Sequence, residues 1–322
     1  MSAVLAHRGA FIGTAVTVAA VLVLVLNGSE QALVIGLITG AGYGLVALGL
    51  VLIYKSSGVF NFAQGEFGTV AVYALWAAHV NGVPYIPAMM LALLAALAMG
   101  LLTERVIIRR LFDAPRVTLL VATAGVSLLA IGVEIWLGEA RLRFIQPALG
   151  RFDRLSVLGI KVSDQRMLIL ATLIILAIAL ALFFSRTNLG LAILAVSQEP
   201  TATELMGISV RRLSSFVWGL AAVLGGLGGV LTAGVVQNFG PGFITSSTLI
   251  PAFTAAVLGG MTSLPGAFVG GVVVGVVQAF AIDLGGEPAF VGIPGPGTLS
   301  VFLLLIGVLA VRPQGLLGKA PS

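Results

Sequence analysis

Long apolar runs alternate with short polar connections along almost the whole chain. A helix that crosses the roughly 30 Å hydrocarbon core of a bilayer needs about 20 mostly apolar residues. The stretch 248–283 is too long for one crossing and is interrupted at 259–266, so it predicts two helices. The other apolar runs are 10–26, 31–54, 65–80, 86–104, 117–138, 167–184, 213–236 and 298–312. The pattern therefore predicts ten membrane helices, or eight or nine if some segments only dip into the membrane.

The composition agrees with a lipid environment. Of 322 residues, 59% are hydrophobic and only 9% are charged, whereas soluble domains are about a quarter charged. We therefore expect an all-α, polytopic integral membrane protein with a single transmembrane domain over residues 1–322. Arg8 precedes the first apolar run and no small-residue cleavage site follows that run, which favours a retained helix over a signal peptide.

The basic residues predict an orientation. They gather in alternate connections, and with ten helices this places both termini in the cytoplasm. The connection 139–166 disagrees, because it would lie outside and yet holds six basic residues beside three acidic ones. Basic residues spread over short connections predict no nucleic-acid role. The inner connections would contain Arg8, Lys55, Arg105, Arg109, Arg110, Arg116, Arg186, Arg211, Arg212, Arg312 and Lys319.

Glycine spacing predicts close helix contacts and a candidate inverted repeat. At a fixed offset of 185 residues, Gly40, Gly44 and Gly49 match Gly225, Gly229 and Gly234, and Thr69 matches Thr254. The matched segments would run in opposite directions through the bilayer, as in the inverted repeats of many transporters. Small residues four apart let helices approach closely, and here they predict packing within one chain. The runs are Gly36/Gly40/Gly44, Gly225/Gly229 and Gly266/Gly270.

The sequence contains no recognisable catalytic equipment. There is no cysteine, no phosphate-binding loop and no Ser/His/Asp or metal-ligand spacing. We expect a protein that is not an enzyme, holds no metal or cofactor, and relies on another chain for any use of ATP. Glu66 and Glu134 lie near predicted helix ends, and Glu104 lies beside Arg105. With no acidic pair expected at mid-membrane, an ion-coupled carrier is disfavoured.

The segment SGVFNFAQGEF (57–67) is unusually polar for its place between two apolar runs. In a structural interpretation, Asn61 caps the next helix, Gln64 reaches back to it, and Glu66 lies near the positive helix end. In a functional one, this helix start faces a translocation pathway and meets a substrate carboxylate. Either way, such a segment has to be buried in protein or face a pore.

A second unusual segment is SRTNLGLAILAVSQEPTATELMGISVRR (185–212), an amphipathic connection on the predicted inner side. Pro200 suits a helix start, Thr201–Met206 suits a short helix, and Gly207 suits its end. Two short helices across the membrane face would offer a docking surface for a soluble partner. The alternative is an ordinary cytoplasmic connection.

Three long segments resemble, in the expected order, the permease subunits of ABC importers for branched-chain amino acids. They read ALGLVLIYKSSGVFNFAQGE (47–66), RTNLGLAILAVSQEPTATELMGIS (186–209) and AVLGGMTSLPGAFVGG (256–271), and the resemblance extends over about residues 30–315. It implies a bacterial or archaeal plasma-membrane protein that pairs with a second, similar permease. It also implies two ATP-binding subunits, which would bind the only ATP, and an external binding protein that delivers the amino acid.

The resemblance also assigns residues. The coupling segment would be Glu199, Pro200, Thr201, Ala202, Thr203, Glu204 and Gly207. Thr201-Ala-Thr203 departs from the family's common Glu-Ala-Ala. Gln64 stands where His is common, and an amide cannot titrate. The pathway residues would be Asn61, Gln64, Gly65 and Glu66. The alternatives are a permease for urea or short amides, an ion-coupled carrier that works alone, and a membrane scaffold.

Overall fold

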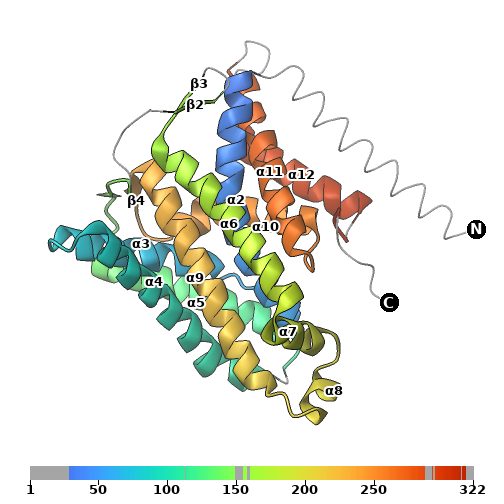
Figure 1. Ribbon diagram of the computed structural model, residues 1–322. Helices are drawn as coiled ribbons and strands as arrows, with labels where there is room; N and C mark the ends of the chain where they lie inside the picture. Colours follow the sequence, from blue (N-terminus) through green and yellow to red (C-terminus); the bar gives the residue numbers. More distant parts are fainter. Residues whose placement is uncertain are drawn as a thin grey trace, which may run out of the picture.

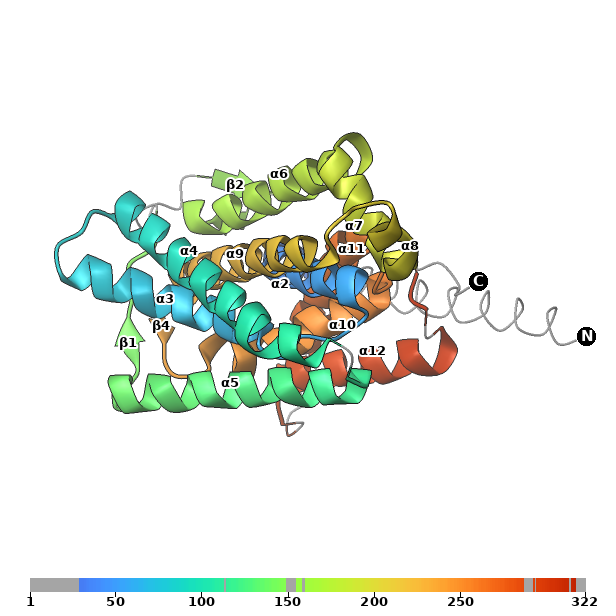
Figure 2. The ribbon, with the colours of Figure 1, turned by 90° about the horizontal axis from the view of Figure 1, so that it is seen from below.

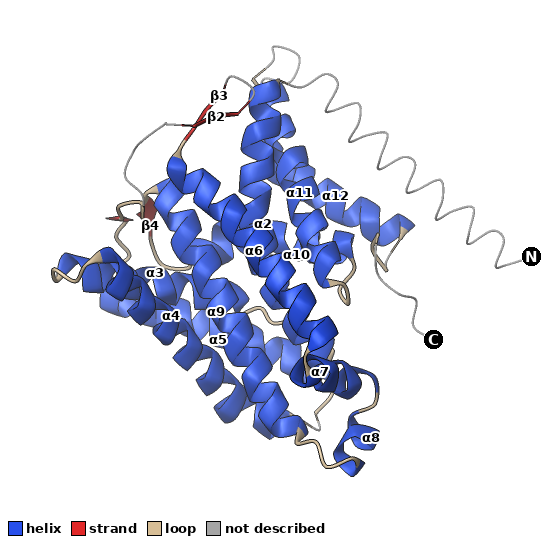
Figure 3. Ribbon diagram, viewed as in Figure 1, coloured by secondary structure: helices blue, strands red, loops and turns tan. Residues whose placement is uncertain are grey.

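The computed structural model is built almost entirely of helices (Figure 1, Figure 3). The predicted helix at 10–26 lies outside the part of the chain that the structure describes. The described residues are 29–112, 114–148, 155–157, 160–286, 292, 294–312 and 314–316.

Each of the nine apolar segments predicted within the described residues corresponds to a helix. By length and apolarity, six helical stretches of this part can cross a membrane, and α3, α10 and α12 are shorter. The helices are α2 (Glu30–Ser57), α3 (Gln64–Val80), α4 (Tyr85–Leu102), α5 (Arg116–Gly138), α6 (Asp164–Arg186), α7 (Asn188–Gln198), α8 (Pro200–Leu205), α9 (Val210–Val236), α10 (Ile250–Gly259), α11 (Leu264–Leu284) and α12 (Pro296–Val311). Shorter turns are the π-helices η1 (Thr103–Ile107) and η3 (Thr245–Leu249) and the 3₁₀-helix η2 (Ile108–Leu111).

Two small antiparallel strand pairs lie at the end of the bundle opposite α7 and α8 (Figure 1). β1 (Arg143–Phe144) pairs with β4 (Asn238–Phe239), and β2 (Leu155–Val157) pairs with β3 (Ile160–Val162). β4 follows α9, whereas the other three strands belong to the basic connection 139–166, which disagreed with the charge rule. Part of its charge is neutralised or covered by protein, because Arg141 pairs with Glu139 at 3.1 Å and the Arg143 guanidinium lies over the Trp76 ring at 4.7 Å.

Local sequence sets the ends of the long helices. The Ser29 hydroxyl caps α2 by accepting from the Ala32 N–H at 3.1 Å. Gly58, at φ +66°, ends α2 and donates its N–H to the Tyr54 carbonyl. Ser209 caps α9 in the same way as Ser29 caps α2, and Gln237 ends α9 in the left-handed conformation.

The central helices are α2 and α9, which cross in opposite directions. In the most apolar window of α2, 83% of residues are buried, against 22% in α6 at the periphery. The α2–α9 contacts run in opposite order, since Gly42 faces Thr232, Val46 faces Gly228, and Gly49 faces Ala221. Figure 2 shows both helices between α5 on one side and α6 on the other.

Backbone-to-backbone contact joins α2 to α11. A Cβ atom added to Gly40 would lie 2.5 Å from the Gly271 carbonyl oxygen, and one added to Gly275 would lie 2.3 Å from the Gly40 Cα. Real Cβ atoms cannot approach so closely, so only glycine fits. The predicted use of the glycine runs for packing within the chain is thus confirmed, also for Gly229, which abuts Gly68 of α3, and Gly270, which abuts Ala255 of α10.

The helix arrangement supports the inverted repeat. At the predicted offset, α2, α3, α4 and α5 correspond to α9, α10, α11 and α12. Each half packs its second and third helices on the first helix of the other half, with α3 and α4 on α9 and with α10 and α11 on α2. Because α2 and α9 run in opposite directions, the two halves are inverted relative to each other.

A buried charge network lies where α4 ends. Glu104 is buried and pairs with Arg109 of η2 at 3.1 Å. The π-helix η1 lengthens the turn after Glu104 and changes which side chains share its face. The Ser215 hydroxyl of α9 donates to the same carboxylate at 2.7 Å, so this network ties the end of α4 to the start of α9.

The α2–α11 contact predicts opposite effects for two Gly→Ala changes. Gly275→Ala should overpack the contact and lower the free energy of unfolding by about 1–3 kcal/mol. Gly132→Ala in α5 has no neighbour within 4 Å of the added Cβ, so it should be neutral or raise stability by up to about 1 kcal/mol. Thermal unfolding of the purified protein in detergent measures both, and equal midpoints would contradict the contact.

Candidate functional site

The segment 57–67 turns back into the bundle after α2 ends. Its Gln64 side chain lies between the middle of α2 and the middle of α9, because a Cβ atom added to Gly49 or Gly225 would lie 2.1 or 2.8 Å from Gln64 Nε2. Gln64 Nε2 also donates to the Ala221 carbonyl of α9 at 2.9 Å. Thus α3 begins inside the bundle rather than at its end. Discontinuous helices of this kind form substrate sites in several transporters.

The polar side chains at this helix start are occupied by the chain itself. Asn61 Oδ1 accepts from the Ala63 N–H at 3.0 Å, and Asn61 Nδ2 donates to Gln64 Oε1 at 3.4 Å. The Phe62 N–H is bonded to the Thr123 hydroxyl of α5 at 3.2 Å. The predicted cap at Asn61 was therefore wrong: the N-cap position is Ala63, and Asn61 organises the turn three residues before Gln64, the first residue of α3. This satisfies polar backbone groups that lipid would leave unpaired.

All four predicted pathway residues lie together in this region. Asn61, Gln64 and Glu66 are at most 1% exposed, and Gly65 is buried against Thr245. Their burial shows how the polar segment is tolerated, since it is enclosed by protein. Their part in transport stays a prediction.

A pair of acidic side chains meets beside the α3 start, and the sequence did not predict it. Glu66 of α3 and Glu134 of α5 are 0% and 6% exposed and interact with each other. Glu134 Oε2 accepts from the Gly242 N–H at 2.8 Å, and a Cβ atom added to Gly242 would lie 3.8 Å from Glu66 Oε1. Both residues lie near helix ends, as predicted, but the sequence did not indicate that these two helix ends meet. The two helices are not neighbours in sequence, so no local pattern could pair them.

A run of hydroxyl side chains continues the polar region on the second half of the repeat. η3 contains Thr245, Ser246, Ser247 and Thr248, and it leads directly into α10. Thr245 packs on Gly65, whereas Ser246 and Ser247 are exposed on the bundle surface. π-helical turns inside helices are frequent at functional sites. Four consecutive hydroxyls in an apolar region were the available sequence signal, and the prediction missed them.

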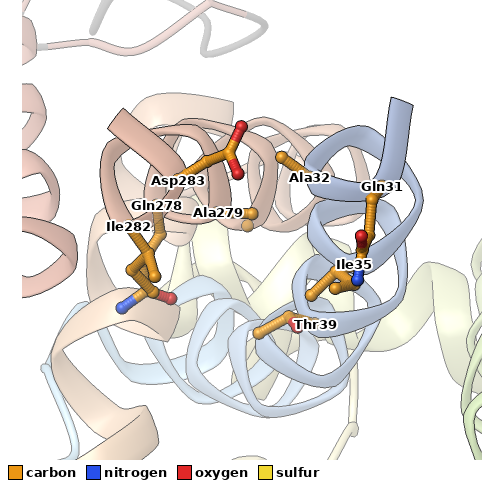
Figure 4. A pocket seen from close by; sticks show the side chains of 9 residues that line it. Gln31, Ala32, Ile35, Thr39, Gln278, Ala279, Ile282 and Asp283 are labelled. Carbon is orange, nitrogen blue, oxygen red and sulfur yellow. The ribbon is translucent and has the colours of Figure 1, made fainter. Parts of the chain in front are cut away.

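A groove of about 220 Å³ lies between the start of α2 and the end of α11 (Figure 4). Gln31 and Thr39 line it from α2, and Asp283 lines it from α11. Gln278 also lines it and accepts a hydrogen bond from the Tyr43 hydroxyl. Polar side chains on adjacent faces of two apolar helices indicate a surface that meets water or protein rather than lipid.

The predicted coupling segment forms two short helices at one end of the bundle, α7 and α8 (Figure 1). Pro200 is the first residue of α8, and Gly207 follows its end at φ +83°. Paired bonds close the helix, from the Gly207 N–H to the Glu204 carbonyl and from the Ile208 N–H to the Thr203 carbonyl.

The side chains of α8 divide into a buried and an exposed set. Thr203 is 3% exposed, and its hydroxyl donates to the Glu199 carbonyl at 2.8 Å. Ala202 and Glu204 are exposed, and Leu205 and the following Met206 are 86% and 81% exposed. The described residues contain no group of three or more His, Cys, Asp or Glu placed to hold a metal ion.

Comparison with known proteins assigns most of the chain to one family. Residues 32–311 match the family described as branched-chain amino acid transport system / permease component. The high-affinity branched-chain amino acid transport system permease protein BraD of Pseudomonas aeruginosa is 34% identical over 304 residues, which are 90% of this chain and 95% of BraD. The protein LivH of Escherichia coli, which has the same description, is 28% identical over 302 residues, covering 88% and 94%. A solved structure, PsaBC from Streptococcus pneumoniae in complex with Fab, aligns with a TM-score of 0.48 at 18% identity, covering 87% of this chain and 92% of that chain.

The two asparagines that flank α3 provide a test of the buried turn. Asn61→Ala removes the bond to the Ala63 N–H inside the bundle and should lower the free energy of unfolding by about 1–2 kcal/mol. Asn81, at the other end of α3, donates to the Ala77 carbonyl at 2.7 Å but is exposed. Asn81→Ala should therefore change stability by less than about 0.5 kcal/mol. Thermal unfolding in detergent compares them, and an Asn61→Ala midpoint equal to wild type would refute the role of the turn.

Proposed function

Because the chain belongs to the family of branched-chain amino acid transport system permease components, we propose that it is the membrane subunit of an ATP-driven importer for branched-chain amino acids. The family match over residues 32–311 carries this proposal. The architecture is compatible with it, since α3 starts inside the bundle at Gln64, opposite Thr245, and encloses the polar side chains of Gln64 and Glu66 in protein.

The importer would contain a second permease, two ATP-binding subunits and an external binding protein. We assign the ATP-binding subunit to the surface formed by α7 and α8, where Ala202, Glu204, Leu205 and Met206 are exposed. Apolar side chains this exposed, on a short helix outside the spanning part, favour a protein contact. The end that carries α7 and α8 would then face the cytoplasm, in agreement with Arg186, Arg211 and Arg212 near it.

The chain would perform no chemical step, because ATP hydrolysis takes place on the partner subunits. Its task is to convert their closure into movement of helices. α8 leads through Gly207 into α9, and α9 contacts Gln64 through Ala221. The Glu104–Arg109–Ser215 network connects the α9 start with the end of α4. Movement of α8 would therefore reach the start of α3 along a single rigid helix.

Uptake of labelled leucine into proteoliposomes tests the function directly. The vesicles would contain this chain, its partner permease, the ATP-binding subunits and the binding protein. ATP-dependent uptake that valine and isoleucine compete with is the expected result. Uptake of urea or a short amide would support an ATP-driven importer but assign it a different substrate. Uptake by this chain alone, driven by an ion gradient, would overturn the proposal.

The α8 surface predicts a selective loss of assembly. Leu205→Glu should reduce copurification of the ATP-binding subunit by at least tenfold, because a charge replaces an exposed apolar contact at the assigned interface; a loss of about 1.4 kcal/mol gives this factor. Leu142→Glu is the matched control, since Leu142 is 74% exposed near the opposite end of the bundle. Both variants should insert normally. Equal copurification of the ATP-binding subunit with Leu205→Glu and with Leu142→Glu would show that α8 is not part of the interface.

A further inference from the structure

Two carboxyl groups are enclosed where α3, α5 and the connection from α9 to η3 meet. The polar side chains that face the Glu66 carboxyl belong to Thr245, Glu134 and Thr69. Neither Glu66 oxygen accepts a hydrogen bond from the described residues, and Glu134 Oε1 also accepts none. Only Glu134 Oε2 has a donor, the Gly242 N–H. The pair thus offers three oxygen atoms that lack a donor.

The charges around the pair do not neutralise it. Arg143 of β1 is the basic group on this side, and its guanidinium lies over the rings of Tyr73 and Trp76 and donates to the Gly138 carbonyl at 2.8 Å. Tyr73, from α3, is the other titratable group that faces Glu134. Among the described residues, neither glutamate forms an ion pair. Two adjacent carboxylates without a counter-ion, away from water, would repel each other strongly.

The available space limits what the pair can bind. Glu66 has 0% exposed surface, so a water-sized molecule cannot touch it in this arrangement. A proton needs no such space, and it supplies both the missing charge and the missing donor. Carboxyl pairs that hold one proton between them are known from other buried sites. We propose that Glu66 and Glu134 form a buried proton-binding site that holds one proton between their carboxyl groups.

The site connects protons to the opening of the bundle. If the α3 start and η3 separate, water reaches both carboxyl groups and each can ionise. The enclosed arrangement then binds one proton more than the open one, so lower pH favours the enclosed arrangement and higher pH favours opening. This coupling to transport rests on the proposed function, whereas the proton site itself does not.

Infrared spectroscopy of the purified full-length protein in lipid nanodiscs counts the proton. At pH 7 the wild type should show the carbonyl stretch of one protonated carboxyl more than the double variant Glu66→Gln/Glu134→Gln. Glu139→Gln is the control, because Glu139 is exposed and pairs with Arg141, and it should keep the wild-type band. A difference of zero or of two protonated carboxyl groups between the wild type and the double variant would overturn the proposal of a shared proton.

The single variants keep the proposal testable if the double variant does not fold. Glu134→Gln retains an oxygen for the Gly242 N–H, and Glu66→Gln leaves Glu134 in place. The unfolding temperature of the wild type should decrease when the pH is raised from 6 to 9. Both single variants should show a smaller decrease. A wild-type midpoint that changes no more than that of Glu66→Gln would overturn the site.

The pH profile of leucine uptake tests the connection with transport. One proton changes an equilibrium by at most about tenfold per pH unit. Wild-type uptake should change several-fold across pH 6–8, whereas that of Glu66→Gln should change less than twofold. Equal pH profiles for the wild type and Glu66→Gln would overturn the coupling. A sodium requirement that is lost in Glu66→Gln would show that the site binds a metal ion and not a proton. If wild-type vesicles take up no leucine at any pH, the proposed function fails and the infrared result still decides the site.

Discussion

Inside a bilayer every backbone N–H and carbonyl needs a partner within the protein, and this constraint governs the structure around the α3 start. A helix that begins at Gln64, in the middle of the bundle, has unpaired groups where lipid supplies none. The chain meets the requirement locally with Asn61 and across helices with Thr123 of α5. It meets it at longer range by enclosing the segment between α2 and α9. The Gln64 side chain fills the space beside residues 49 and 225, and both are glycine because a Cβ atom at either position would collide with it.

The inverted repeat explains how two such interruptions come to lie together. α3 follows α2 but packs on α9, and α10 follows α9 but packs on α2. The two helix starts, at Gln64 and at η3, therefore face each other near the centre, where Gly65 packs directly on Thr245. A side chain as small as a methyl group at Gly65 would push the two halves apart. No space remains between Gly65 and Thr245, so a small displacement of either half would change this contact.

The sequence predicts some of these features well, for physical reasons. Apolar runs and glycine spacing report on local helix faces, so the nine predicted helices within the described residues and the packing of the glycine runs within the chain were predictable. Pro200 and Gly207 carry their own backbone preferences, so the bounds of α8 were nearly correct. The pairing of Glu104 with Arg109 could not be predicted, because the sequence does not reveal the π-helical turn that brings them together. Glu66 and Glu134 were treated as separate residues near helix ends, because their meeting depends on where α3 starts within the bundle.

Burial of two carboxyl groups beside the close contact of Gly65 with Thr245 has an energetic consequence for opening. Burial of an unpaired charge costs several kcal/mol, and a shared proton removes one of the two charges but leaves the other in place. Opening exposes this remaining charge to water, which offsets part of the apolar and hydrogen-bonding energy lost at Gly65 and Gln64. The acidic pair therefore lowers the free-energy difference between the enclosed and the open arrangement. In an importer that cycles on each ATP, such a balance lets the closure of distant subunits move helices that pack as closely as α2 and α11.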